Sequence, residues 1–202
     1  MTLTNWGYSI TELGAMLTDD EFNEMTADRY KGDERIAPLI SAATAAVRNY
    51  CGWHVAPSEK CELSARAHDL RLTYVGCDTI IQLPARFVSA VESVKIGGHE
   101  VTDYSIEPNG LLRIYDHCIC SRKTVIEVSY TAGLSDELAG AVKELVGHQV
   151  THGMAQSYGV QSEAAGGVSV TYSASWINSA KATALPDDNR DTLAPYRLQG
   201  VF

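Results

Sequence analysis

The chain has 202 residues, of which 45% are hydrophobic and 20% are charged, and its formal net charge is −9. This length favours one domain or a domain with a sizeable appendage, and the composition is typical of a globular chain rather than a disordered one. The negative charge argues against a protein that grips nucleic-acid backbone, because that task needs clustered Lys and Arg. It does not exclude work beside DNA, since an acidic surface repels phosphates and lets DNA move past.

The chain shows no targeting or membrane signal. No basic segment leads into an apolar run near the N-terminus, so we expect no secretory signal. No run approaches the roughly 18–20 apolar residues that cross a bilayer, so we expect no membrane partner. Five cysteines, an odd number, are typical of free thiols in a reducing cytoplasm.

Two helix signals lie in the first quarter of the chain. Thr18 and Glu21 fit a capping box, which predicts a short helix over residues 19–30. A clearer helix begins between Asp33 and Ile36 and ends at Gly52, because its apolar residues recur at helical spacing. The stripe consists of Ile36, Leu39, Ile40, Ala43, Val47, Tyr50 and Cys51.

From about Lys60 to Ala132 the apolar period changes from that of a helix to that of a strand. Gly97-Gly98 and Asn109-Gly110 lie between alternating runs, and both pairs readily adopt the positive φ angles of two-residue turns. The region therefore predicts a compact antiparallel module of five or six strands.

A second strong helix is predicted after this module, with Ser135 as its N-cap. One more alternating strand follows through Val168, Val170 and Tyr172, and the last thirty residues hold one short helix and a tail. The order predicts an α+β fold, with helices packed together, an inserted antiparallel β-rich module and an extended C-terminal tail. The predicted parts are residues 1–32 without an assigned role, a helical core with a β-strand over 33–60 and 131–184, the β module over 61–130, and a C-terminal arm over 185–202.

The stretch GHQVTHG, residues 147–153, differs by one letter from the H-E-x-x-H zinc-protease signature. His148 and His152 can reach one metal ion, but Gln149 replaces the glutamate that acts as general base, and no third ligand is evident. Two interpretations stay open. The histidines make ordinary hydrogen bonds or subunit contacts at the edge of the apolar stripe, or they centre a metal site, in the extreme case a metal-dependent hydrolase.

Other catalytic or metal-binding signatures are missing. His117, Cys118 and Cys120 lie close together, but no C-x-x-C pair accompanies them, which favours free cysteines near a strand turn. The chain has no nucleophile elbow, phosphate loop or dinucleotide fingerprint. We therefore expect no enzyme, no catalytic residue, no bound metal and no cofactor.

The opposite face of the second helix carries small residues, and its members are Gly140, Glu144, Gly147 and Thr151. A glycine inside a helix costs roughly 1 kcal/mol relative to alanine. Either these glycines are tolerated in solvent, or another helix approaches closely, in which case the four residues are candidate contacts with a neighbouring subunit. The second interpretation predicts that Gly147→Leu leaves the monomer folded and blocks assembly.

Several segments, taken in order, resemble the head–tail connector proteins of tailed double-stranded DNA phages, also called adaptors or head-completion proteins. The segments are ISAATAAVRNYCGWHVAPSE, LPARFVSAVESVKIGGHEVTDYSIEPNGLLRI, VIEVSYTAGLSDELAGAVKELVGHQV, GGVSVTYS and LAPYRL. The resemblance runs from about Ile36 to the C-terminus, and residues 1–32 match nothing in the pattern.

The resemblance implies a non-enzymatic virion protein at the head–tail junction, made in the host cytoplasm. Such proteins form a ring, usually of twelve subunits, beneath the portal, and extend the channel through which DNA passes without sequence-specific binding. Their partners are the portal protein and the next tail or stopper protein. Another ring-forming neck or tail protein, such as a tail terminator, is the alternative.

In this family the C-terminal tail commonly grips the portal. If that carries over, the arm from Leu185 to Phe202 binds the portal, and the candidate contacts are Leu193, Tyr196, Arg197 and Leu198. The β module would lie on the outer or lower side of the ring.

Overall fold

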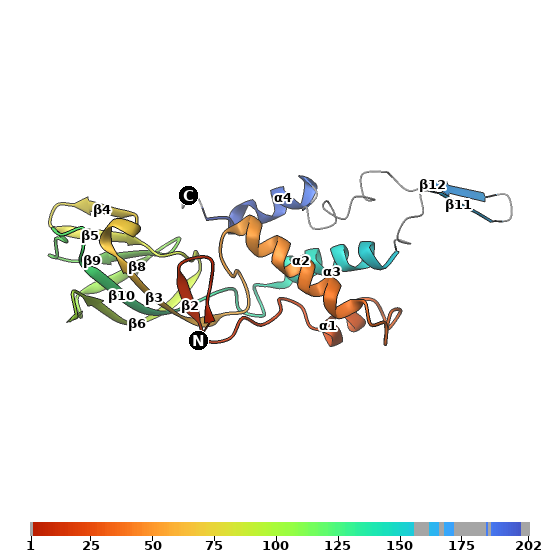
Figure 1. Ribbon diagram of the computed structural model, residues 1–202, viewed down its shortest axis with the longest axis horizontal. Coiled ribbons are helices and arrows are strands. Elements are labelled where there is room, and N and C mark those ends of the chain that lie inside the picture. The colour runs from red at the N-terminus through yellow and green to blue at the C-terminus, as the bar shows by residue number, and fades with distance from the viewer. Residues whose placement is uncertain (1, 156–161, 166–167, 172–184, 186, 199–202) are drawn as a thin grey trace. The chain divides into compact units, whose positions relative to one another are not determined.

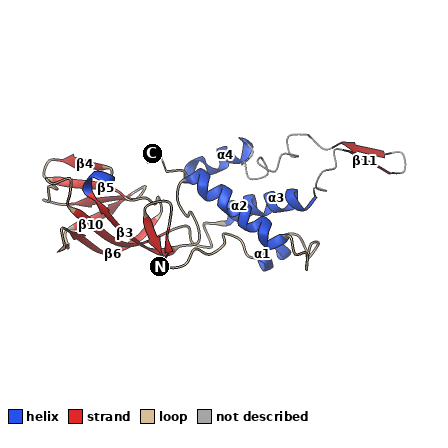
Figure 2. Cartoon of the chain, viewed as in Figure 1, coloured by secondary structure: helices blue, strands red, loops and turns tan. Residues whose placement is uncertain are grey.

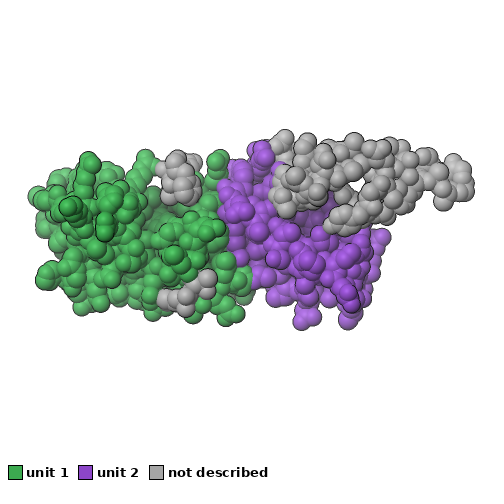
Figure 3. All heavy atoms as spheres, viewed as in Figure 1, with its two compact units in different colours: residues 1–14, 51–139, 195–202 green, residues 15–50, 140–194 purple. Residues whose placement is uncertain are grey.

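The computed structural model describes residues 2–155, 162–165, 168–171, 185 and 187–198 (Figure 1). Its elements form an α+β fold, which confirms the predicted class (Figure 2). The chain divides into two compact units (Figure 3). The β unit comprises residues 1–14, 51–139 and 195–202, and the helical unit comprises residues 15–50 and 140–194.

The β unit contains two antiparallel sheets. The six-stranded sheet has the order β1 (Thr2–Leu3), β2 (Tyr8–Ile10), β3 (Glu59–Arg66), β10 (Val125–Ala132), β6 (Val88–Ile96), β7 (His99–Val101). The four-stranded sheet has the order β4 (Leu72–Val75), β5 (Asp78–Gln82), β9 (Leu111–Ile114), β8 (Tyr104–Glu107). A separate pair, β11 (Ser162–Ala165) and β12 (Val168–Thr171), contains Val168 and Val170 of the predicted strand, whereas Tyr172 lies outside the described residues.

Alternation along β10 shows why these residues form a sheet with one buried face. Ile126, Val128 and Tyr130 are buried, whereas Val125 and Glu127, which alternate with them, are exposed. Val128 pairs with Leu63 of β3 on one side and with Val94 of β6 on the other, and both partners are buried. The predicted turns are confirmed, because Gly97, Gly98, Asn109 and Gly110 all have positive φ.

The helical unit contains α1 (Asp19–Met25), α2 (Ile36–Cys51, whose last residue is counted with the β unit), α3 (Gly140–Ala155) and α4 (Asp187–Leu193). The capping box at α1 is confirmed, since Thr18 Oγ1 accepts from Glu21 N at 3.2 Å and Glu21 Oε2 accepts from Thr18 N at 2.8 Å. The predicted α2 is confirmed as well, and Gly52 follows it with φ of +79°. None of the helices in the described ranges could cross a membrane.

The start of α3 differs from the prediction. Residues 136–138 form a turn in which Leu138 N and Ala139 N both donate to Ser135 O, and the helix begins only at Gly140. The reason lies just upstream, where Leu134 N donates to Val55 O at 2.7 Å and so holds the backbone in the β unit. Leu138, the last residue of this turn, is 63% exposed.

The division of the chain also differs from the four predicted parts. Tyr8–Ile10 pairs with β3, so residues 1–14 belong to the β unit, and α1 places residues 15–32 in the helical unit. Between residues 59 and 132 the structure has eight strands rather than five or six. The additional ones are short, and a three- or four-residue strand leaves little alternation in the sequence.

Candidate interaction surfaces

Helix α3 buries one broad face inside the helical unit, formed by Val142, Leu145, Val146, Gly147, Val150 and Met154. The sequence placed Gly147 on the face opposite the apolar stripe, either in solvent or against another helix. A Cβ at Gly147 would lie 2.8 Å from Met25 Cε and 3.8 Å from Leu17 Cδ2. The close approach that this glycine permits is therefore made by α1 and the segment before it in the same chain.

The other three residues of the predicted subunit contact have different surroundings. Gly140 and Glu144 are exposed, and nothing lies within 4 Å of a Cβ built at Gly140. Thr151 is half-buried, and its Oγ1 donates to Gly147 O at 2.9 Å. The surface at Gly140 and Glu144 is therefore accessible to solvent in the isolated chain. Their contact with another subunit stays a prediction.

An ion pair joins α1 to α3 within the helical unit. Lys143 Nζ lies 2.6 Å from Glu21 Oε1. Partial burial opposes ionisation of Glu21, but hydrogen bonds from Lys143 and Thr18 outweigh it and lower the pKa of the carboxyl. The carboxylate that closes the capping box therefore also fixes α1 against α3.

His148 and His152 are both exposed on α3. Across the described ranges, no group of three or more His, Cys, Asp or Glu side chains is placed to hold a metal ion. The hypothesis of a metal-dependent hydrolase centred on His148 and His152 therefore finds no third metal ligand among the described residues.

All five cysteines are free thiols, and they fall into two classes. Cys51 and Cys61 are buried, and burial raises the pKa of each thiol to about 12. Cys77, Cys118 and Cys120 are exposed, and the Sγ atoms of Cys118 and Cys120 lie 3.9 Å apart.

We expect a maleimide at near-neutral pH to modify three thiols in the native chain and all five after unfolding. Thiolate is the reactive form, so the buried pair with the raised pKa stays unmodified. Intact-mass measurement counts the adducts, and Cys77→Ser should remove one from the native count. Equally fast labelling of Cys51 or Cys61 would contradict the burial described above.

The C-terminal segment 195–198, which we call the C-terminal clasp, is held on the β unit by three hydrogen bonds. Trp53 Nε1 donates to Tyr196 O at 2.7 Å, and Leu198 N donates to Cys51 O at 2.9 Å. Arg86 Nη1 donates to Arg197 O at 3.1 Å. The ring of Phe87 lies between those of Trp53 and Tyr196, with centroid distances of 6.0 and 5.9 Å.

The four predicted portal contacts differ in how far their side chains are exposed to solvent. Leu193, at the end of α4, is fully buried, and Tyr196 and Leu198 are half-buried. Arg197 is exposed. The sequence indicated this segment as a candidate contact but not the surface of the β unit on which it lies. Trp53, Phe87 and Tyr196 are far apart along the chain, so no local pattern shows that they contact one another.

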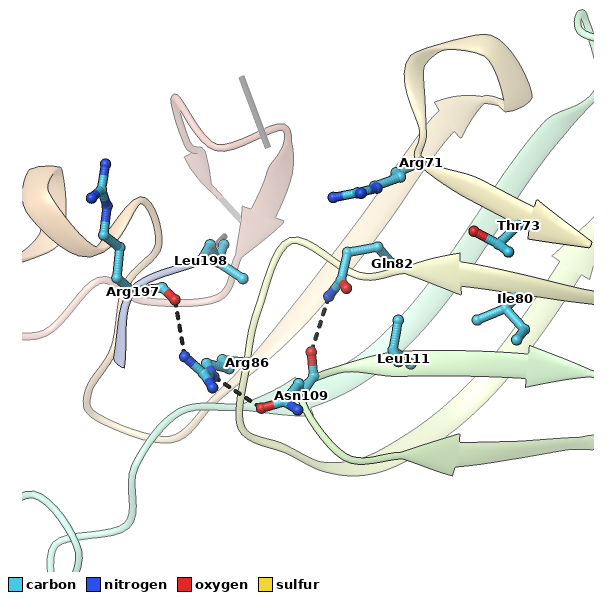
Figure 4. Close-up of a pocket in the computed structure, with 9 residues that line it drawn as sticks. All are labelled: Arg71, Thr73, Ile80, Gln82, Arg86, Asn109, Leu111, Arg197 and Leu198. Atoms are coloured by element: carbon cyan, nitrogen blue, oxygen red, sulfur yellow. Dashed lines mark hydrogen bonds between the residues drawn. The ribbon is translucent and has the colours of Figure 1, made fainter. Parts of the chain in front are cut away.

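A pocket that no sequence pattern indicates lies beside the C-terminal clasp (Figure 4). It has a volume of about 370 Å³ and lies wholly within the β unit. Its lining residues are Arg71, Thr73, Ile80, Gln82, Arg86, Asn109, Leu111, Arg197 and Leu198. Three arginines and no carboxylate line it, in a chain whose net charge is −9.

Comparison with known proteins gives one family. No curated protein matches the chain in sequence. A family model described as "Head completion protein" matches residues 15–198, which includes α1 and so begins earlier than the resemblance noted from the sequence. Because that match covers most of the chain, from the capping box at Thr18 to the C-terminal clasp, the chain belongs to the head completion protein family.

Proposed function

We propose that this head completion protein forms a ring of twelve subunits beneath the portal, extends the DNA channel and presents the docking surface for a tail or stopper protein. The observation that carries the proposal is the family match over residues 15–198, which supports a structural role at the phage head–tail junction. In this role the protein is made in the host cytoplasm, joins the virion and catalyses no reaction.

The charge of the chain supports a channel through which DNA passes. A net charge of −9 disfavours tight binding of phosphates, so a duplex can move past the ring without sequence-specific contacts. Gly140 and Glu144, exposed at the start of α3, are proposed contacts between neighbouring subunits. Two helices that meet at a glycine can approach closely, which suits a packed ring.

The C-terminal clasp supports a portal contact. Its backbone is fixed by Trp53, Cys51 and Arg86, so the exposed side chain of Arg197 is presented from a defined position. A pre-positioned side chain loses less conformational entropy on binding than a free tail does. We therefore propose Arg197 and the exposed part of Tyr196 as portal contacts.

Mixing the purified chain with purified portal tests the proposal. Mass photometry should show one ring of twelve chains added to each portal, and Arg197→Glu should abolish the addition. Arg66→Glu, an exposed arginine on β3 of the same unit, serves as the matched control and should bind as the wild type does. A chain that never joins the portal, yet caps isolated tail tubes, would instead be a tail terminator.

A further inference from the structure

The pocket beside the C-terminal clasp, which we call the arginine pocket after Arg71, Arg86 and Arg197, lies at one end of the exposed face of the four-stranded sheet. Thr73 of β4 pairs with Ile80 of β5, and Gln82 pairs with Leu111 of β9, so these lining residues form adjacent positions on one face. The opposite face of the same strands carries the buried Ile81 and Leu112. The pocket is therefore built on a regular sheet with a packed core behind it.

Arg86 is fixed in this pocket before any ligand arrives. Its Nε donates to Asn109 Oδ1 at 3.0 Å and its Nη1 donates to Arg197 O at 3.1 Å, as Figure 4 shows. Asn109 is itself held, because Gln82 Nε2 donates to Asn109 O at 3.0 Å. The guanidinium has five N–H donors, so donors beyond these two bonds remain for an anion.

Arg71 supplies a second guanidinium from the residue before β4. Figure 4 shows Arg71 on one side of the pocket and Arg86 on the other, with Gln82 and Leu198 between them. Among the described residues, the Arg71 side chain makes no hydrogen bond or ion pair, and it is exposed. Because no carboxylate lines the pocket, both guanidinium groups keep N–H donors for an anionic group of another molecule.

The lining favours an anion carried by a protein chain. Ile80, Leu111 and Leu198 place aliphatic surface beside the two arginines, which suits a carboxylate flanked by apolar side chains. A duplex presents its phosphates on a convex surface, and a concave pocket of about 370 Å³ admits a side chain but not a duplex. The volume also falls within the roughly 300–1,000 Å³ that is usual for ligand sites.

We propose that this pocket is a docking site for an acidic segment of another protein, in which Arg71 and Arg86, on opposite sides of the pocket, bind carboxylate groups of the segment. The C-terminal clasp forms one wall, since Leu198 lines the pocket and Arg86 bonds to Arg197 O. Binding of the segment and seating of the C-terminal clasp therefore support each other. As a site for a neighbouring virion protein, this inference rests on the proposed function.

The test uses the full chain and a fluorescein-labelled, C-terminally amidated hexapeptide of alternating Glu and Leu. The matched probe replaces each Glu by Gln, and anisotropy is measured at low ionic strength in a buffer without phosphate or sulfate. We expect the Glu probe to bind about tenfold more tightly than the Gln probe, because a guanidinium forms stronger hydrogen bonds to a charged carboxylate than to a neutral amide. Arg71→Gln should reduce that difference clearly, and Arg66→Gln should keep it.

Three results would overturn the inference: equal binding of the two probes, an unchanged preference in Arg71→Gln, or Arg71-dependent binding of a short DNA duplex in place of the peptide. Arg71 is exposed and its side chain has no partner among the described residues, so the variant should fold, which circular dichroism checks. The measurement involves no portal. Failure here leaves the ring proposal standing, and failure of the ring leaves the pocket's chemistry intact.

Discussion

Trp53→Ala is expected to lower the free energy of unfolding by about 3–5 kcal/mol, the usual cost of truncating a buried tryptophan. Trp53 is fully buried, its ring stacks on Phe87, and its Nε1–H is the donor to Tyr196 O. The alanine variant loses the packing and also releases the backbone of the C-terminal clasp. Urea denaturation followed by far-UV circular dichroism measures the loss.

Trp53→Phe is the matched control, because it keeps an aromatic ring beside Phe87 but removes the indole donor. We expect this variant to lose about 1–3 kcal/mol, since Tyr196 O is left without its partner. Portal binding should weaken in both variants if the C-terminal clasp contacts the portal. Losses of the same size in Trp53→Ala and Trp53→Phe would show that packing contributes nothing, contrary to the buried geometry.

Gly147→Leu is expected to destabilise the chain itself by about 1–3 kcal/mol, because the added side chain has to displace Met25, which is 46% exposed, and press against the buried Leu17. A side chain at Gly147 would meet Met25 and Leu17, which lie at 2.8 and 3.8 Å from its Cβ position. The interpretation of this face as a subunit contact instead predicts a folded monomer that fails to assemble. Thermal unfolding of the isolated chain distinguishes the two expectations directly.

Two matched variants sharpen this experiment. Gly140→Leu places the same side chain on the same helix in open space, so its stability should stay within about 0.5 kcal/mol of the wild type. Gly147→Leu combined with Met25→Ala should recover part of the loss, because the two residues are in contact. A Gly147→Leu chain as stable as the wild type would mean that Met25 and Leu17 do not fill this space.

Local patterns predicted the elements that depend on local energetics. The apolar stripe of α2 and its stop at Gly52 follow from helical spacing and a positive φ. The capping box at Thr18 follows from two side chains three residues apart. In each case the stabilising contacts lie within one or two turns of chain, so the sequence contains all the partners.

Elements that depend on distant partners could not be predicted in this way. Tyr8–Ile10 is three residues long, and its partner β3 lies about fifty residues later. The neighbours of Gly147 come from α1 and the segment before it, so a helical wheel of α3 alone assigns that face to solvent or to another subunit. The arginine pocket joins the turn beside Asn109 to the C-terminal clasp, and only the folded β unit brings them together.

The most direct test of the central claim is a cryo-electron microscopy reconstruction of portal incubated with this chain. We expect a twelve-subunit ring on one end of the portal, with Arg197 of each subunit facing portal density and the DNA channel continuous through both rings. A portal with no added density, or a ring of this chain attached only to tail tubes, would contradict it.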